Sequence, residues 1–64
     1  MKVRDAMRML SDDGWFIVRV SGSHRVLKHA SKSGIVVVPG HPYDELAPGT
    51  LKSIRDQARL EGKL

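Results

Sequence analysis

Three short runs of strand-forming residues follow one another in the middle of this chain, separated by segments too short to hold a helix. Rich in valine, isoleucine and aromatic residues, they span residues 15–20, 25–29 and 35–38. Ser21-Gly22-Ser23 and residues 30–34 have the composition of turns. Pro39-Gly40 ends the third run, because proline has no N–H to donate to a neighbouring strand. Strands joined by such short turns predict an antiparallel sheet.

Amphipathic helices are predicted on both sides of these strands, over residues 2–13 and from about Gly49 to Leu60. The side chains expected to face the sheet are Val3, Ala6, Met7 and Leu10 in the first helix and Leu51, Ile54 and Ala58 in the second. Gly14 suits the left-handed position that ends a helix, Pro48 suits a helix start, and Gly62 lies just past the second helix. The order α-β-β-β-α predicts an α+β fold in which both helices cover one face of a three-stranded antiparallel sheet.

The chain length predicts a single domain, residues 1–64. A domain of this size buries only about 60% of the surface that its unfolded chain exposes. The absence of cysteine excludes disulfides and cysteine-based zinc sites, and the three histidines lack the spacing of metal ligands, so we expect neither a metal nor another cofactor. Without an 18-residue apolar run or the apolar stretch of a signal peptide, we expect a cytoplasmic protein with no membrane contact.

Positive charge is concentrated in the middle of the chain. The net charge is +4, and no Asp or Glu occurs from Gly14 to Tyr43. That interval contains Arg19, Arg25, Lys28, Lys32 and all three histidines, His24, His29 and His41. A segment of one sign predicts a polyanionic partner, nucleic acid first and an acidic protein second. Solvated lysines and arginines that cluster by chance would give the same pattern.

His24 stands directly after the first predicted turn, at the start of the second strand. Alternation along that strand places Lys28 on the same face as His24, and Arg25, Leu27 and His29 on the opposite face. At about 3.3 Å per residue, Lys28 lies about 13 Å from His24, which suits contact with a neighbouring phosphate. We expect the face that the helices leave open to carry much of the basic surface.

Several short motifs occur in an order and at a spacing that resemble one protein family over nearly the full chain. They are Gly14-Trp15 followed by Arg19, then Gly22-Ser23-His24, Val38-Pro39-Gly40-His41-Pro42, Asp44-Glu45-Leu46, Gly49-Thr50-Leu51, Ile54 and Gln57-Ala58. The chain resembles the HicA (YcfA-like) toxins of bacterial toxin–antitoxin systems, which have a fold like that of double-stranded-RNA-binding domains. Two positions depart from the family pattern, since Ala30 stands where many members have proline and Arg59 stands where glycine is common.

The resemblance implies a ribosome-independent mRNA interferase whose essential histidine falls on His24, with mRNA and a HicB-type antitoxin as partners. RNA carries its own nucleophile, the 2′-hydroxyl, so cleavage needs a base, donors for the charged phosphorane and an acid for the leaving 5′-oxygen. Histidine can exchange a proton near neutral pH. The residues expected to bind RNA are Arg19, Ser23, Arg25, Lys28 and Lys32. We expect the antitoxin to cover the His24 face, because a basic sheet also attracts acidic side chains.

Some alternatives remain open at this point. Water, His29 or His41 can supply the second proton transfer, although His29 suits a structural role or an RNA contact and His41 suits a loop-fixing hydrogen bond. The same basic fold also suits an RNA-binding module without catalysis, or a domain that binds only an acidic protein. Trp15 and the pair Met7 and Met9 are most simply core residues.

Overall fold

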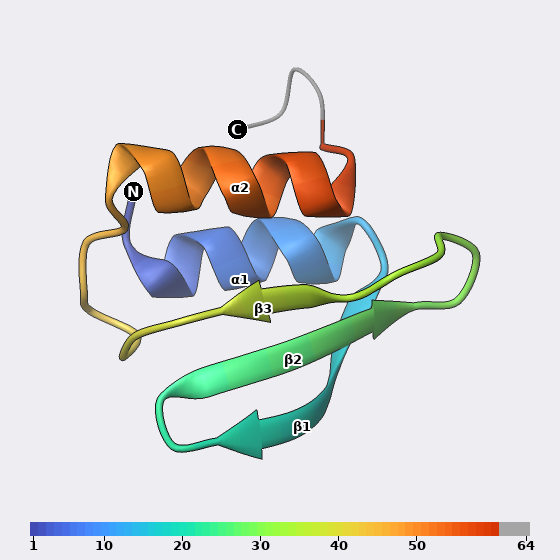
Figure 1. The fold of residues 1–64 in the computed structure, drawn as a ribbon, viewed down its shortest axis with the longest axis horizontal. Helices are drawn as coiled ribbons and strands as arrows, with labels where there is room; N and C mark the ends of the chain where they lie inside the picture. The colour runs from blue at the N-terminus through green and yellow to red at the C-terminus, as the bar shows by residue number, and fades with distance from the viewer. Residues whose placement is uncertain (61–64) are drawn as a thin grey trace.

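The helices and strands follow one another in the predicted order. The computed structural model describes residues 1–60 and contains α1 (Val3–Asp12), β1 (Trp15–Ser21), β2 (His24–His29), β3 (Val36–Val38) and α2 (Pro48–Ala58). The strands form an antiparallel sheet in the order β1-β2-β3, which confirms the predicted α+β fold (Figure 1). The predicted bounds are within two residues of the observed ones, and Gly62 lies outside the described residues.

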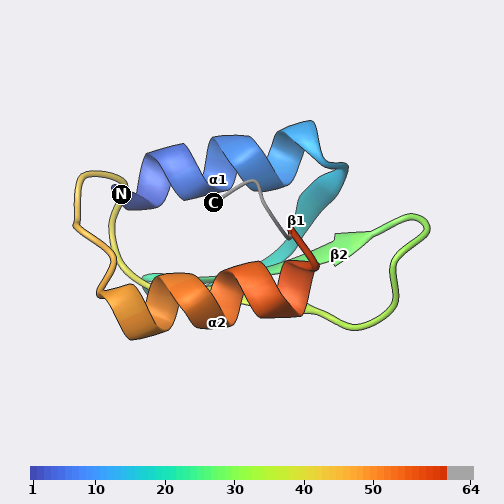
Figure 2. The ribbon, with the colours of Figure 1, turned by 90° about the horizontal axis from the view of Figure 1, so that it is seen from above.

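Both helices lie side by side on one face of the sheet (Figure 2), with α1 next to β1 and α2 next to β3. The core between helices and sheet consists of Val3, Ala6, Leu10, Trp15, Leu27, Val36, Val38, Leu46, Ile54, Ala58 and Leu60. Met7 and Leu51, also predicted to face the sheet, are only partly buried and pack against this core. Within residues 1–60, neither helix has the length and apolar character needed to cross a membrane.

The register of β2 with its neighbours confirms the predicted alternation. Its inner face carries Arg25, Leu27 and His29, and its outer face carries His24, Val26 and Lys28. Leu27 lies opposite Val36, and both side chains are at most 1% exposed beneath the helices. Lys28 lies opposite Phe16, and both are exposed. The strand therefore separates a face packed against the helices from one that the helices leave open, where Val26 is 9% exposed and His24 and Lys28 are exposed.

The edge strand β1 is exposed over most of its length. Its register with β2 shifts between Ile17 and Arg19, so that Val18 is an extra residue, as in a β-bulge. Only Trp15 is buried in this strand. The exposed apolar side chains of β1 are Phe16, Ile17, Val18 and Val20. Sequence periodicity did not indicate which face of this strand would be inner, because both are apolar.

The segment after β3 holds the start of α1. The backbone N–H groups of Val3 and Arg4 donate to the carbonyls of Asp44 and Pro42, each over 2.9 Å. These donors have no acceptor within the helix, because the first turn of any helix lacks preceding carbonyls. The N–H of His41 donates to Oδ2 of Asp44 over 2.9 Å, so the loop that carries His41 is also fixed.

Gly14 connects α1 to β1 in a conformation that requires glycine. Its φ is +103°, and a Cβ at this position would lie 2.7 Å from Nε2 of His29. That nitrogen is 2.6 Å from the carbonyl oxygen of Asp13. A side chain at residue 14 would therefore strain the backbone and also displace the histidine ring.

We predict that Gly14→Ala lowers the free energy of unfolding by at least about 1 kcal/mol more than Gly34→Ala does. Gly34 also has a positive φ, +85°, but nothing lies within 4 Å of a Cβ placed there. The control thus carries the backbone strain without the clash. Urea denaturation of both variants measures the difference, and equal losses would show that the contact with His29 has no energetic weight.

Candidate functional site

The site predicted from the sequence is at the end of the sheet where β1 turns into β2. His24 is the first residue of β2 and lies opposite Ser21, the last residue of β1. Gly22 between them has a φ of +58°, in the left-handed region that suits glycine. The His24 side chain is exposed, and within residues 1–60 its ring makes no hydrogen bond or ion pair. Its two nitrogens are therefore open to a ligand.

Arg25 lies next to His24 but points to the other side of the sheet. Its Nη1 donates to the carbonyl oxygen of Gly40 over 2.7 Å, and the residue is half-buried opposite Val38. This bond ties the start of β2 to the loop after β3. The RNA contact of Arg25 stays a prediction. One of its guanidinium donors already holds the loop after β3.

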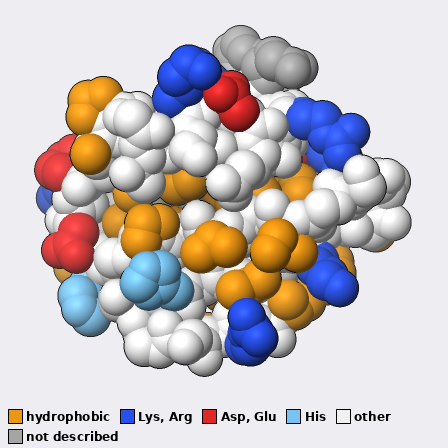
Figure 3. All heavy atoms as spheres, viewed as in Figure 1, with side chains coloured by type: hydrophobic (Ala, Val, Ile, Leu, Met, Phe, Trp, Pro, Cys, Tyr) orange, Lys and Arg blue, Asp and Glu red, His pale blue; other side chains and the backbone are white. Residues whose placement is uncertain are grey.

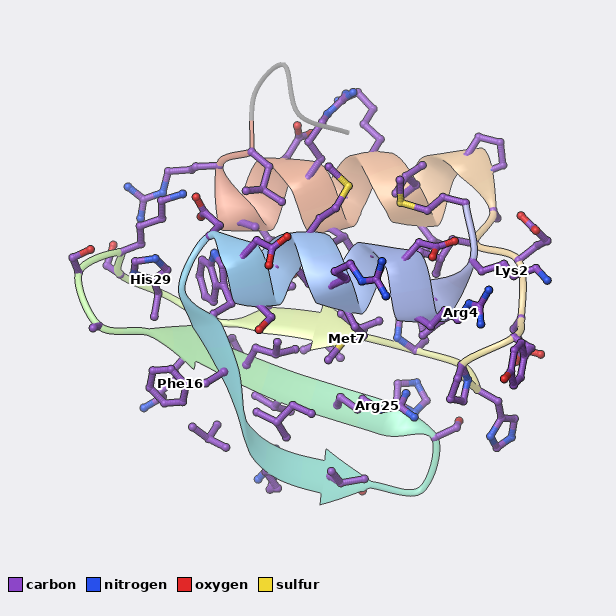
Figure 4. All side chains as sticks on the ribbon, turned by 180° about the vertical axis from the view of Figure 1, so that it is seen from behind. Lys2, Arg4, Met7, Phe16, Arg25 and His29 are labelled. Carbon is purple, nitrogen blue, oxygen red and sulfur yellow. The ribbon has the colours of Figure 1, made fainter. Side chains whose placement is uncertain are left out.

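His41 follows Gly40 directly, so the Arg25 bond brings a second histidine to the same end of the sheet. Figure 3 shows two histidine side chains near each other there, and Figure 4 labels His29 at the opposite end from Arg25. The pairing of Arg25 with Val38 also places the loop that carries His41 beside the start of β2, where His24 lies. The His41 side chain is exposed, and its ring has no partner within the described residues.

Both ring nitrogens of His29 are occupied within the fold. Nδ1 accepts the backbone N–H groups of Ser31 and Lys32 over 3.0 and 3.1 Å. Nε2 therefore carries the proton and donates to the carbonyl of Asp13. The ring also meets the Trp15 ring edge-to-face, with 5.2 Å between centroids. Of the two roles open to His29 in the sequence, the contacts favour the structural one.

Lys32 also lies at the end of β2 that is far from His24. Its ammonium contacts the carboxylate of Asp13 at 2.5 Å and the carbonyl of Ala58 at 3.1 Å. These contacts link the ends of the two helices across the β2–β3 turn. The prediction that Lys32 binds RNA stays a prediction, and its ammonium already has an anionic partner.

The outer face of the sheet carries His24 together with two predicted RNA-binding residues, Arg19 and Lys28. By register, Arg19 lies opposite Val26 and Lys28 lies opposite Phe16. Both cations are exposed, and neither has a hydrogen bond or ion pair within residues 1–60. Of the five predicted RNA-binding residues, these two and Ser23 are therefore placed with His24.

Sequence reasoning missed the link between the start of β2 and the loop after β3. The strand register would have predicted this link, because an antiparallel pair of Arg25 with Val38 places the residues after Val38 beside His24.

Within residues 1–60 there is no group of three or more His, Asp or Glu side chains that could hold a metal ion.

The sequence matches the family described as HicA toxin of bacterial toxin-antitoxin over residues 3–60. The chain belongs to the HicA toxin family. It is thus the toxin of a toxin–antitoxin pair, and an antitoxin is its implied partner. A comparison with curated proteins gave no match. In this HicA-family toxin, the family motifs around residues 22–24 and 38–42 meet at one end of the sheet.

We predict that Lys32→Met lowers the free energy of unfolding by about 1–3 kcal/mol, because it leaves the partly buried Asp13 carboxylate without its ammonium partner. Lys28→Met, the same substitution at an exposed lysine, should stay within about 0.5 kcal/mol of the wild type. Thermal or urea denaturation of the two variants tests this. A loss of equal size in both would contradict a structural role specific to Lys32.

Proposed function

We propose that this toxin is an endoribonuclease that cleaves mRNA, with His24 exchanging the proton of the 2′-hydroxyl. The observation that carries the proposal is the exposed imidazole of His24, which has no partner within residues 1–60 and shares a face with the unpaired cations Arg19 and Lys28. A free imidazole beside cations that attract phosphates provides both the proton exchange and the substrate binding that RNA cleavage needs.

The proposed reaction is a transesterification. His24 takes the proton of the 2′-hydroxyl, the 2′-oxygen bonds to the adjacent phosphorus, and the bond from phosphorus to the 5′-oxygen breaks. The leaving 5′-oxygen takes up a proton. The products are a 2′,3′-cyclic phosphate and a 5′-hydroxyl, and no metal or redox partner is needed for the balance.

The turn before His24 and the outer face of β2 would bind different phosphates of the same RNA strand. Ser23, half-buried in the turn, can donate its hydroxyl proton to a non-bridging oxygen of the cleaved phosphate. Lys28 lies four residues along β2, about 13 Å away, and suits the next phosphates of the strand. Arg19 lies between them on the neighbouring strand, so RNA would run along this face of the sheet.

His41 is our candidate for the acid that protonates the leaving 5′-oxygen. Its loop follows Val38, which pairs with Arg25 next to His24, and the bonds from Arg25 to Gly40 and from the His41 N–H to Asp44 fix its backbone. Its exposed ring is free to meet RNA. Of the two other histidines, His29 uses both nitrogens inside the fold, which favours His41 for this step.

We predict that His24→Ala lowers the rate of RNA cleavage by about 10²–10⁴-fold, the usual contribution of one acid–base group, while RNA affinity stays within a few-fold. The assay follows the 2′,3′-cyclic phosphate product, and circular dichroism checks the fold. A matched RNA with a 2′-deoxy nucleotide at the cut site should resist the wild type. RNA binding without cleavage by either protein would instead support the non-catalytic RNA-binding module.

We predict that His41→Gln slows cleavage by about 10²-fold at neutral pH, because the proton donor for the leaving 5′-oxygen is lost. An RNA with sulfur in place of the bridging 5′-oxygen has a leaving group that needs no acid. This substrate should restore cleavage by His41→Gln and leave the rate of His24→Ala lowered. Unchanged rates in His41→Gln, or no rescue by sulfur, would assign the acid role to another group such as water.

A further inference from the structure

An open apolar groove lies between α1 and β1, on the inner side of the edge strand. Its volume is about 440 Å³, and its apolar lining includes Met7, Phe16, Ile17 and Leu27. Arg4 and Arg8 from α1 also line it, and no Asp or Glu does. Figure 4 labels Arg4, Met7 and Phe16, which belong to this lining. None of these groove residues is assigned to RNA cleavage above.

The groove continues into the exposed edge strand. In the sheet of residues 1–60, β1 pairs only with β2, so its outer edge has no partner strand. Its apolar side chains are exposed beyond the groove, at Val18 and Val20 as well as at Phe16 and Ile17. An apolar edge of this kind promotes association unless another chain covers it.

The charges around the groove indicate what covers it. Arg8 is exposed and has no ion pair within the described residues. Arg4 has an exposed ion pair with Asp5 at 3.9 Å, and its guanidinium lies 5.1 Å from the centroid of the Tyr43 ring. A second copy packed on this edge would bring arginines of the same surface together, which is unfavourable. RNA would pair with the arginines but leave the apolar lining without a partner. A protein segment with apolar side chains and carboxylates matches both features.

We propose that the antitoxin inserts an apolar, acidic segment between α1 and β1, with its apolar side chains against Met7 and Ile17 and its carboxylates on Arg4 and Arg8. The proposal rests on the antitoxin partnership that family membership implies and not on catalysis by His24. An antitoxin segment bound along the whole length of β1 would end beside Ser21, which lies opposite His24. Adjacent strands lie about 4.8 Å apart, so a strand added outside β1 is about 10 Å from β2, within reach of its side chains. Docking in the groove thereby brings the antitoxin to the cleavage site.

The test measures binding of residues 1–64, as the His24→Ala variant, to the purified cognate antitoxin. Calorimetry compares Ile17→Glu with Ile35→Glu, because both isoleucines are 47% exposed and only Ile17 lines the groove. We expect Ile17→Glu to raise Kd at least about tenfold and Ile35→Glu to leave it within about twofold. Arg8→Glu, at an exposed helix position, should raise Kd several-fold and flatten its salt dependence.

Tight binding by both Ile17→Glu and Arg8→Glu would overturn the proposal, and so would equal weakening by Ile35→Glu. Sedimentation of the toxin alone tests whether a second copy occupies the groove, and fluorescence anisotropy of a labelled RNA tests whether RNA does. If Ile17→Glu changed only self-association or only RNA binding, and not antitoxin binding, the proposal would also be overturned. Thermal melts verify that each variant is folded. Because no step depends on cleavage, failure of the proposed nuclease activity would leave the binding result interpretable.

Discussion

The register of the central strand β2 determines where every other part of this toxin lies. Leu27 packs opposite Val36 beneath the helices, and a slip of one residue would move it to the open face and bring His24 into the core. At the two ends of the same inner face, Arg25 and His29 each donate to a backbone carbonyl, of Gly40 and Asp13 respectively. One strand therefore holds both the segment that precedes β1 and the loop that follows β3, and it presents the candidate catalytic histidine on the face it leaves open.

Residues of the same type have different hydrogen-bond partners in this fold. His29 uses both ring nitrogens within the fold, whereas the rings of His24 and His41 have none of their nitrogens engaged within residues 1–60. The lysines divide in the same way, since Lys32 joins the ends of the two helices and Lys28 extends from the outer face. Composition alone had placed all of these cations and histidines in one basic segment. The fold separates those that hold the molecule together from those that can meet a phosphate.

The sequence predicted the elements and the faces of β2 because each depends on local periodicity, which residues 2–13 and 25–29 show clearly. It did not predict the bulge at Val18 or the contacts of Lys32, because the first lies in a run that is apolar on both faces and the second depends on residues distant in the chain. Arg59, where the family commonly has glycine, adopts the left-handed conformation, with φ +55°. That conformation costs a non-glycine residue about 1–2 kcal/mol. The guanidinium offsets part of this cost by donating to the carbonyl and hydroxyl oxygens of Ser33, over 3.1 and 3.0 Å.

The edge strand β1 is the part of the sheet that the helices leave open. Within residues 1–60, the two helices bury the inner faces of β2 and β3, and β1 stays exposed beyond Trp15. A partner that binds only the folded toxin adds to its stability by mass action, so an antitoxin on β1 would complete the fold as well as block it. The same strand ends opposite His24, so an antitoxin bound along it would cover the apolar edge and close the proposed active site in one binding event. A toxin whose free form leaves this edge open is expected to be less stable than its complex, and its release from the antitoxin would expose the apolar edge and the proposed catalytic face together.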